Sequence, residues 1–164
     1  MSKRKDFSNQ MYDKYDTIAK RTAVEFFQQY NYELVDSNSM SREYFSKGDL
    51  EIQRKDTKKP FMIEVEIKNP WKVSGKWQPN FDTVDFLESK INTSASYWVL
   101  FNYTRDTLLV TSLDNIRQSP VDTKDALIED GTRTKDEKYR KIPISKCKFY
   151  KKTVTGWKHL DDTN

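Results

Sequence analysis

Two neighbouring segments of the sequence alternate between apolar and polar residues, and this pattern constrains the fold more than any other feature. Every odd-numbered residue of Phe61–Lys68 is apolar, while the even-numbered ones include Glu64, Glu66 and Lys68. Asp49–Gln53 repeats the same alternation. A two-residue period is that of a β-strand with one buried face. The sequence therefore predicts a hairpin with a core face on one side and a charged face on the other.

The N-terminal half also contains a predicted helix. Residues 8–29 carry apolar side chains at three- and four-residue spacings, which is the pattern of an amphipathic helix. Glu25 falls on the apolar side of this helix and is expected to point at the sheet. Residues 32–35 are predicted to form a short strand, 69–80 a loop with Pro and Gly, and 81–91 either a helix or a strand.

The C-terminal half is predicted to be richer in strands. The nearly continuous apolar run 96–103 is typical of a strand buried on both faces, and 107–111 is expected to pair with it. Residues 113–117 are expected to form a short helix capped near Ser112 or Asp114. We expect a loop over 120–134 and a strand over 138–150, which Pro143 places at a sheet edge.

Length and composition set broad limits on the class of protein. The chain has 164 residues, enough for one hydrophobic core and short for two, so we expect one domain over residues 1–164 with frayed termini. The net charge of +4 is too small to define a partner. The single cysteine, Cys147, cannot form an internal disulfide, and no segment is long and apolar enough to cross a bilayer. A cytoplasmic protein that does not associate with membranes is therefore expected.

Asp49, Glu66 and Lys68 form a pattern suited to phosphodiester cleavage. Carboxylates are the ligands that a hard cation such as Mg²⁺ prefers, and the cation polarises the phosphoryl oxygen and helps to generate hydroxide. An ammonium two residues after a ligand lies on the same strand face, close to the attacking water. Glu64 shares that face, so Glu64 and Glu66 both remain candidates for the principal metal ligand.

The order of these features resembles the PD-(D/E)xK nuclease superfamily. The features are a helix with Glu25, a strand, Gly48-Asp49 and then Glu66-Ile67-Lys68, and the resemblance covers about residues 8–103. It implies that Asp49 and Glu66 bind Mg²⁺ or Mn²⁺, that Lys68 assists the water and that Glu25 is a further catalytic acid. Gly48 replaces the family's proline, which alters a turn and no ligand. The implied fold is α/β, a restriction-endonuclease-like mixed β-sheet core flanked by helices.

Basic and aromatic residues suggest where nucleic acid would bind. Lysines are concentrated in residues 133–158, which suits contact with phosphates, although lysines can also protect an edge strand from pairing with another chain. Two tryptophans of loop 69–80 can stack on bases or pack onto the core. The predicted nucleic-acid contacts are Trp71, Lys72, Lys76, Trp77, Lys146, Lys148 and Lys151.

The function expected from these features is a metal-dependent endonuclease that hydrolyses phosphodiester bonds in DNA. A homodimer is an expected arrangement, because many nucleases of the family dimerise to cut both strands. A structure-specific or RNA-directed nuclease is an alternative within enzymes. A catalytically inactive nucleic-acid-binding module and an interaction protein without nucleic acid are alternatives from other classes. The presence of Asp49, Glu66 and Lys68 together favours the enzyme.

Overall fold

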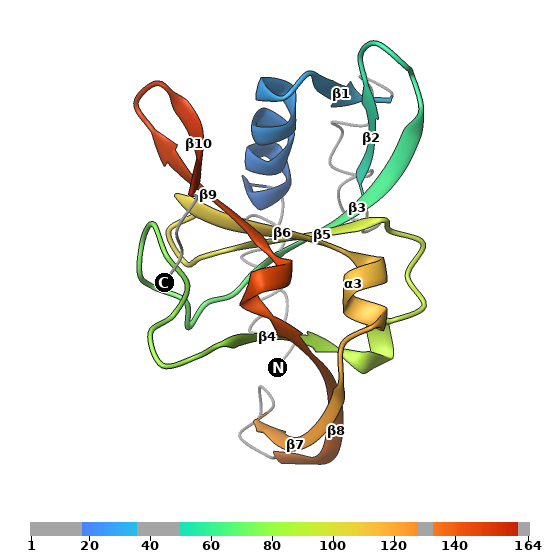
Figure 1. Ribbon diagram of the computed structural model, residues 1–164, viewed down its shortest axis with the longest axis vertical. Coiled ribbons are helices and arrows are strands. Elements are labelled where there is room, and N and C mark those ends of the chain that lie inside the picture. Colours follow the sequence, from blue (N-terminus) through green and yellow to red (C-terminus); the bar gives the residue numbers. More distant parts are fainter. Residues whose placement is uncertain (1–17, 36–49, 128–132, 161–164) are drawn as a thin grey trace, which may run out of the picture.

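β-Strands dominate the protein. The computed structural model describes residues 18–35, 50–127 and 133–160, and Figure 1 shows how their elements are arranged. Seven strands form one sheet, in the order β1 (Tyr32–Leu34), β2 (Leu50–Arg54), β3 (Pro60–Ile67), β5 (Tyr97–Phe101), β6 (Thr107–Ser112), β9 (Lys148–Thr153) and β10 (Gly156–Leu160). Three strands form a second sheet, in the order β4 (Thr83–Leu87), β8 (Arg133–Pro143) and β7 (Val121–Leu127). The described helical segments are a helix over residues 18–29, η2 (Glu88–Lys90), α3 (Leu113–Arg117) and η3 (Ile144–Lys146).

One pair of strands in the large sheet is parallel. Strands β3 and β5 run in the same direction, with Glu66 paired to Leu100, whereas the other neighbouring pairs in both sheets are antiparallel. Parallel neighbours need a long connection, and here it is formed by residues 68–96. This connection carries β4 into the second sheet before the chain returns to the first.

The expected α/β fold with a helix-flanked sheet is wrong. The chain is mostly β, and its seven-stranded sheet is curled into a half-barrel. Residues 81–91, which were ambiguous in the sequence, form β4 and η2 because Val84 and Phe86 alternate in burial with Thr83 and Asp85, the period of a strand. Within the described residues, the connection between β3 and β5 therefore contains no α-helix to cover the sheet.

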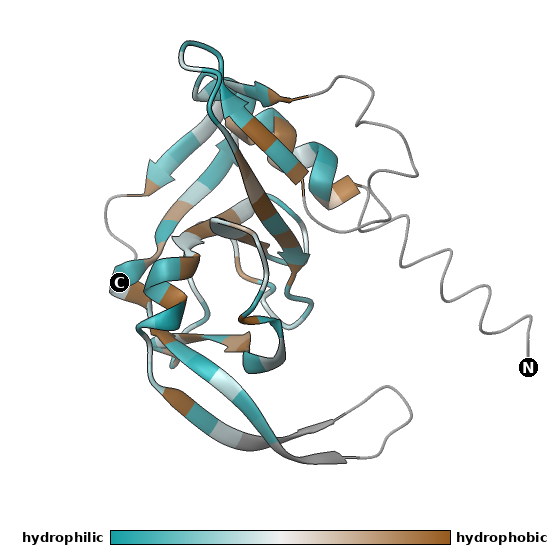
Figure 2. Ribbon diagram, turned by 90° about the vertical axis from the view of Figure 1, so that its right-hand side faces the viewer, coloured by the Kyte–Doolittle hydropathy of each residue, from teal (hydrophilic) through white to brown (hydrophobic). Residues whose placement is uncertain are grey.

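Several local predictions are confirmed and three are wrong. One of the three is the single strand expected over 138–150, which η3 divides into the end of β8 and the start of β9. Strands β5 and β6 pair as expected, and α3 begins after Ser112, whose hydroxyl accepts a hydrogen bond from the Asn115 N–H at 3.0 Å. The loop expected at 120–134 instead contains β7, which pairs with β8 in an arm that extends away from the body (Figures 1 and 2). Residues Val121–Thr123 of this arm are exposed, so they face no core and lack the alternation that marks a half-buried strand. Pro143 is not at an edge strand, because it ends β8, the middle strand of its sheet.

Two hydrophobic clusters cover the opposite faces of the large sheet. The first contains the helix over residues 18–29 packed on β2, β3, β5 and β6, and includes Phe26, Phe27, Ile63 and Val65. The second contains loop 69–80, β4, α3 and residues of β5, β6 and β9, and includes Trp71, Phe86, Trp98 and Phe149. Figure 2 shows the same alternation of hydrophobic and hydrophilic residues along the strands. The alternation in Phe61–Lys68 is therefore confirmed, with its odd-numbered residues facing the helix.

Candidate functional site

Glu64 and Glu66 lie on the face of β3 that points away from the helix over residues 18–29. Glu64 is paired with Trp98 and Glu66 with Leu100, and directly paired residues on neighbouring strands project from the same face. Trp98 and Leu100 belong to the second cluster. Both glutamates are half-buried, and Oε2 of Glu64 is almost completely shielded from solvent. The two carboxylates thus lie two residues apart at the margin of a core.

Lys68 extends the pairing of β3 by one residue. Its backbone N–H donates a hydrogen bond of 2.8 Å to the carbonyl of Phe101, so the strand geometry continues past Ile67. Its side chain is half-buried. Strand alternation therefore places Glu66 and Lys68 on the same face of the sheet, at the end where β3 and β5 both terminate.

Lys90 is a partner of Glu66 that the sequence did not indicate. The Lys90 Nζ lies 2.8 Å from Oε1 of Glu66, and their side chains are 43% and 31% exposed. Lys90 is the last residue of η2, in the segment that could be read as either helix or strand, and so its direction could not be inferred. The charge on Glu66 is thus balanced by a side chain of the connection between β3 and β5.

Asp49 lies outside the described residues. It precedes Leu50, and Leu50 is paired with Ile63, the neighbour of Glu64. Among the described residues, no three Asp, Glu, His or Cys side chains are arranged to hold one metal ion. The predicted metal ligands Glu64 and Glu66 therefore stand together on β3, and the contribution of Asp49 remains a prediction.

Glu25 does not point at the sheet, so the predicted orientation of its side chain is wrong. Its side chain is 61% exposed and lies 3.7 Å from the Nζ of Lys152 on β9. Ile18, seven residues earlier and so on nearly the same side of the helix, is itself only half-buried. This side is therefore the boundary of the buried stripe. The helix also covers the face of the sheet opposite to Glu66.

Trp71 and Trp77 lie in the core, so their predicted stacking on nucleic-acid bases is wrong. They are 0% and 4% exposed, and their ring centroids lie 4.8 Å apart with the planes at 67°. Both rings also contact Phe149 of β9. The indole N–H of Trp71 donates to the carbonyl of Lys76 at 2.9 Å. These contacts hold loop 69–80 against the first residues of β9, while Lys72 and Lys76 of the loop remain exposed.

Asp106 organises the end of the sheet, and sequence reasoning missed it. Its Oδ1 accepts hydrogen bonds from Asn102, Thr104 and Thr107, and its Oδ2 accepts one of 2.6 Å from Ser74. Burial acts to raise the pKa of this carboxyl, but the four hydrogen bonds outweigh it and hold the pKa below its ordinary value. Asp106 thereby ties loop 69–80 to the turn between β5 and β6.

The predicted nucleic-acid-binding lysines do not form one surface. Lys72, Lys76, Lys146 and Lys148 are exposed and Lys151 is half-buried. Lys148 is paired with Val110, which packs on the first cluster, whereas Lys151 follows the face of Phe149 in the second cluster. Alternation therefore places Lys148 and Lys151 on opposite faces of β9. Lys151 lies instead beside loop 69–80, where a Cβ added at Gly75 would meet its Cδ at 3.4 Å.

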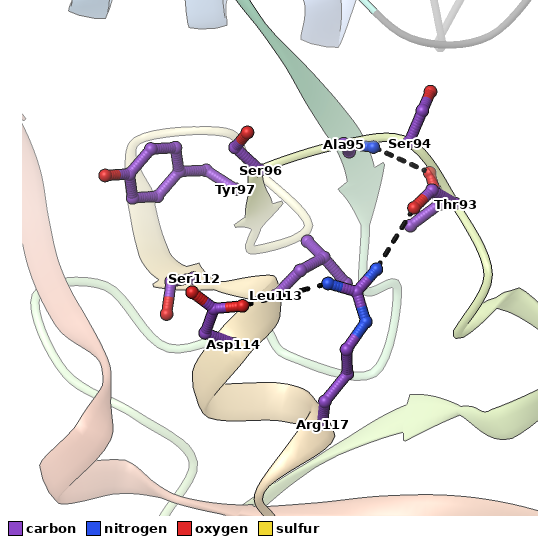
Figure 3. Close-up of a pocket in the computed structure, with 9 residues that line it drawn as sticks. All are labelled: Thr93, Ser94, Ala95, Ser96, Tyr97, Ser112, Leu113, Asp114 and Arg117. Atoms are coloured by element: carbon purple, nitrogen blue, oxygen red, sulfur yellow. Dashed lines mark hydrogen bonds and ion pairs between the residues drawn. The ribbon is translucent and has the colours of Figure 1, made fainter.

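A pocket with a volume of about 380 Å³ lies at the other end of β5. Figure 3 shows Arg117 of α3 lying between Asp114 and Thr93 in this pocket. The Arg117 guanidinium donates to the carbonyls of Ile91 and Thr93. Arg117 therefore joins α3 to the segment that precedes β5, and its donors are used within the protein.

Comparison with known proteins leaves the family of this chain open. No protein-family model matches the chain, and no similar curated protein or solved structure was found. Within the described residues, no helix has the length and apolar character that a membrane span requires. The functional inference therefore depends on the residues of the protein itself.

Proposed function

We propose that the protein is a metal-dependent endonuclease that hydrolyses phosphodiester bonds in DNA. The observation that carries the proposal is the position of Glu64 and Glu66 on one face of β3, next to Lys68 at the end of the strand. Two carboxylates and an ammonium within five residues are the groups that metal-assisted phosphodiester cleavage uses. Their resemblance to the Glu-x-Lys motif of PD-(D/E)xK nucleases adds to the proposal.

The donor set on β3 fits a hard divalent cation. Glu64 and Glu66 supply carboxylate oxygens, which Mg²⁺ and Mn²⁺ prefer over nitrogen or sulfur, and Asp49 would supply a third carboxylate. The bound metal would polarise the phosphoryl oxygen and lower the pKa of its water. For Glu66 to bind the metal, its ion pair with Lys90 would have to break. Both side chains are partly exposed, so breaking the pair costs roughly 0.2–1 kcal/mol, the usual value of a surface ion pair.

Lys68 is assigned the role of an electrostatic helper. An ammonium beside the phosphate stabilises the negative charge that develops in the transition state and orients the attacking water. It binds no metal, because a protonated amine offers no lone pair. Loss of Lys68 should therefore affect cleavage and leave metal binding intact.

One observation favours a second candidate, a nucleic-acid-binding module without catalysis. The 2.8 Å ion pair between Lys90 and Glu66 already satisfies one carboxylate, as expected where the acid has a purely structural role. Such a module would bind nucleic acid equally well with and without a metal.

Incubation with nucleic acids distinguishes these candidates. Supercoiled plasmid, branched DNA and RNA are each incubated with the protein in Mg²⁺, Mn²⁺ or EDTA, and products are separated on gels. We expect DNA cleavage in Mg²⁺ or Mn²⁺ that EDTA and Glu66→Ala abolish. Cleavage of RNA alone would change the substrate class, and metal-independent binding without cleavage of any substrate would support the non-catalytic module.

A further inference from the structure

Five residues from three distant parts of the chain form a basic surface at the end of the sheet where β3 and β5 terminate. We define this basic surface as Lys72, Lys76, Tyr103, Lys151 and Lys158. Lys72 and Lys76 come from loop 69–80, Tyr103 lies in the turn after β5, and the other two lie on β9 and β10. We propose that the basic surface binds a single-stranded polynucleotide and delivers it to Glu66.

Short contacts join the parts of the basic surface. The Nζ of Lys72 lies 5.4 Å from the centroid of the Tyr103 ring, and the N–H of Tyr103 donates to the carbonyl of Trp71 at 2.7 Å. Lys151 runs beside Gly75, the neighbour of Lys76. Lys151 is paired directly with Lys158. The five residues are thus held by one continuous set of backbone and side-chain contacts.

The positive charge of the basic surface is not balanced by ion pairs among the residues that the structure describes. Like charges directly opposite each other on neighbouring strands destabilise a sheet, yet Lys151 and Lys158 occupy such a position. Within the described residues, none of the four lysines forms an ion pair with an acid. The nearby carboxylate of Asp106 is occupied by four hydrogen bonds. A chain of phosphates supplies the negative charge that the basic surface lacks.

Tyr103 points to a single strand as the form of the ligand. Its side chain is 52% exposed beside the Lys72 ammonium, whereas the tryptophans of loop 69–80 are buried. Unpaired bases stack on exposed aromatic rings while lysines contact the phosphates between them. In a duplex the bases are stacked on one another and offer no free face to Tyr103.

The basic surface lies close to the candidate metal ligands. Glu66 is paired with Leu100, three residues before Tyr103, and three residues of chain span at most roughly 10–11 Å. Asp106 fixes loop 69–80 to the turn after Tyr103, so little ordering of the protein is needed on binding. A strand held on Tyr103 and the lysines would therefore pass close to Glu66. This positional step rests on the proposed nuclease function, whereas binding itself does not.

Fluorescence anisotropy with a labelled oligothymidine in EDTA tests the basic surface without any contribution from a metal. We expect tighter binding to oligothymidine than to a duplex of equal length. Tyr103→Ala should weaken binding roughly ten- to a hundredfold, the effect of losing one stacked base. The matched control is Tyr97→Ala, because Tyr97 is 41% exposed at the opposite end of β5. Thermal unfolding of each variant verifies that it is folded.

The contribution of the lysine charges to oligothymidine binding is tested in the same assay. Lys151→Gln combined with Lys158→Gln should lower the slope of log affinity against log salt by about 0.7 for each lost phosphate contact with a single strand. Lys59→Gln, on an exposed position before β3, should leave the slope unchanged. Equal affinities of Tyr103→Ala and Tyr97→Ala, or equal binding of oligothymidine, duplex and heparin, would overturn the inference.

The variant Glu66→Ala separates this inference from the proposed function. In EDTA it should still bind oligothymidine, with an affinity no lower than that of the wild type, because it removes a negative charge near the basic surface and none of the five residues that form it. If the wild type binds through Tyr103 but cleaves nothing in Mg²⁺ or Mn²⁺, the basic surface stands and the nuclease proposal fails. If it cleaves DNA while Tyr103→Ala binds and cleaves normally, the nuclease proposal stands and the basic surface fails.

Discussion

The ammonium nitrogen of Lys90 lies 2.8 Å from a carboxylate oxygen of Glu66, so the acid proposed to bind a metal already has a cation beside it. Lys90 and a divalent metal would compete for the same charge. Both side chains are partly exposed, which limits the strength of their attraction. A metal can therefore displace Lys90 from Glu66, and the presence of Lys90 should measurably lower the affinity of the protein for the metal.

Replacing Lys90 should raise the affinity for the metal. Lys90→Gln removes the competing cation, and an exposed pair is worth roughly 0.2–1 kcal/mol, so the Mg²⁺ concentration that gives half-maximal cleavage should fall by up to about fivefold. The measurement is cleavage rate against Mg²⁺ concentration, with Lys59→Gln as the control. A higher Mg²⁺ requirement in Lys90→Gln would indicate that Lys90 supports catalysis instead of competing.

Glu66 and Lys68 should differ in a paired measurement of binding and cleavage. Glu66→Ala removes a metal ligand and should lower both Mg²⁺ affinity and cleavage. Lys68→Ala should reduce cleavage on the order of a hundredfold or more, because it removes only transition-state stabilisation. DNA binding in Ca²⁺, an oxygen-seeking cation of the same charge, should stay near the wild-type value in Lys68→Ala. Cleavage by Lys68→Ala at the wild-type rate would refute the motif assignment.

Lysines on the two faces of β9 should contribute differently to the binding of oligothymidine. Lys151 lies beside loop 69–80, whereas Lys148 projects from the other face of the strand. Lys151→Gln should weaken binding to oligothymidine and flatten its salt dependence, and Lys148→Gln should change neither. Binding affinity measured over a series of salt concentrations provides the comparison. Equal effects of the two substitutions would mean that charge alone, and not its position, determines binding.

Trp71 should contribute to stability and Tyr103 to binding. Trp71 is fully buried against Trp77 and Phe149, so Trp71→Ala should lower the free energy of unfolding by about 3–5 kcal/mol. Tyr103→Ala removes an exposed ring and should cost far less. Urea unfolding followed by circular dichroism measures both. A small effect of Trp71→Ala would mean that loop 69–80 is not part of the core.

Asp106 should make the protein sensitive to acid. Folding lowers the pKa of this carboxyl from its ordinary value of 3.8, so its contribution to stability is present above that value. The contribution is lost as the pH falls from 3.8 through the lower pKa of the folded state. Asp106→Asn should therefore be less stable than the wild type near neutral pH, and the difference should shrink below pH 3.8. Unfolding free energies measured at several pH values test this, and a constant difference would exclude Asp106 as the source.

The strands of the central region could be predicted from the sequence, because a strand that is buried on one face has apolar residues at every second position. Phe61–Lys68 shows that period, and its odd-numbered residues face the helix as predicted. The β7 strand shows no such period, because its first residues, 121–123, are all exposed. The segment forming β4 is too short for periodicity to separate a strand from a helix. The α/β prediction came from the family resemblance, and the described connection between β3 and β5 does not contain the α-helix that the resemblance implied.

The candidate site was only partly accessible to sequence reasoning. Glu64, Glu66 and Lys68 were found because strand alternation places them together. Whether the Glu25 side chain points at the sheet or at solvent depends on where the apolar stripe of the helix ends. A small rotation of the helix about its axis changes this orientation. The contacts of Lys90 with Glu66, and of Lys72 with Tyr103, join segments that no local pattern connects. Such contacts are set by the tertiary fold.

The second cluster is assembled from segments far apart in the chain, and this order affects synthesis on the ribosome. Trp71, Trp77 and Trp98 emerge early, but Phe149 comes from β9, which follows the whole β7–β8 arm. Until β9 has left the ribosome, the nascent chain lacks the side chain that packs against two of these tryptophans. Its indole rings are then a target for chaperones and a source of aggregation. The second cluster can therefore be completed only after β9 has been synthesised.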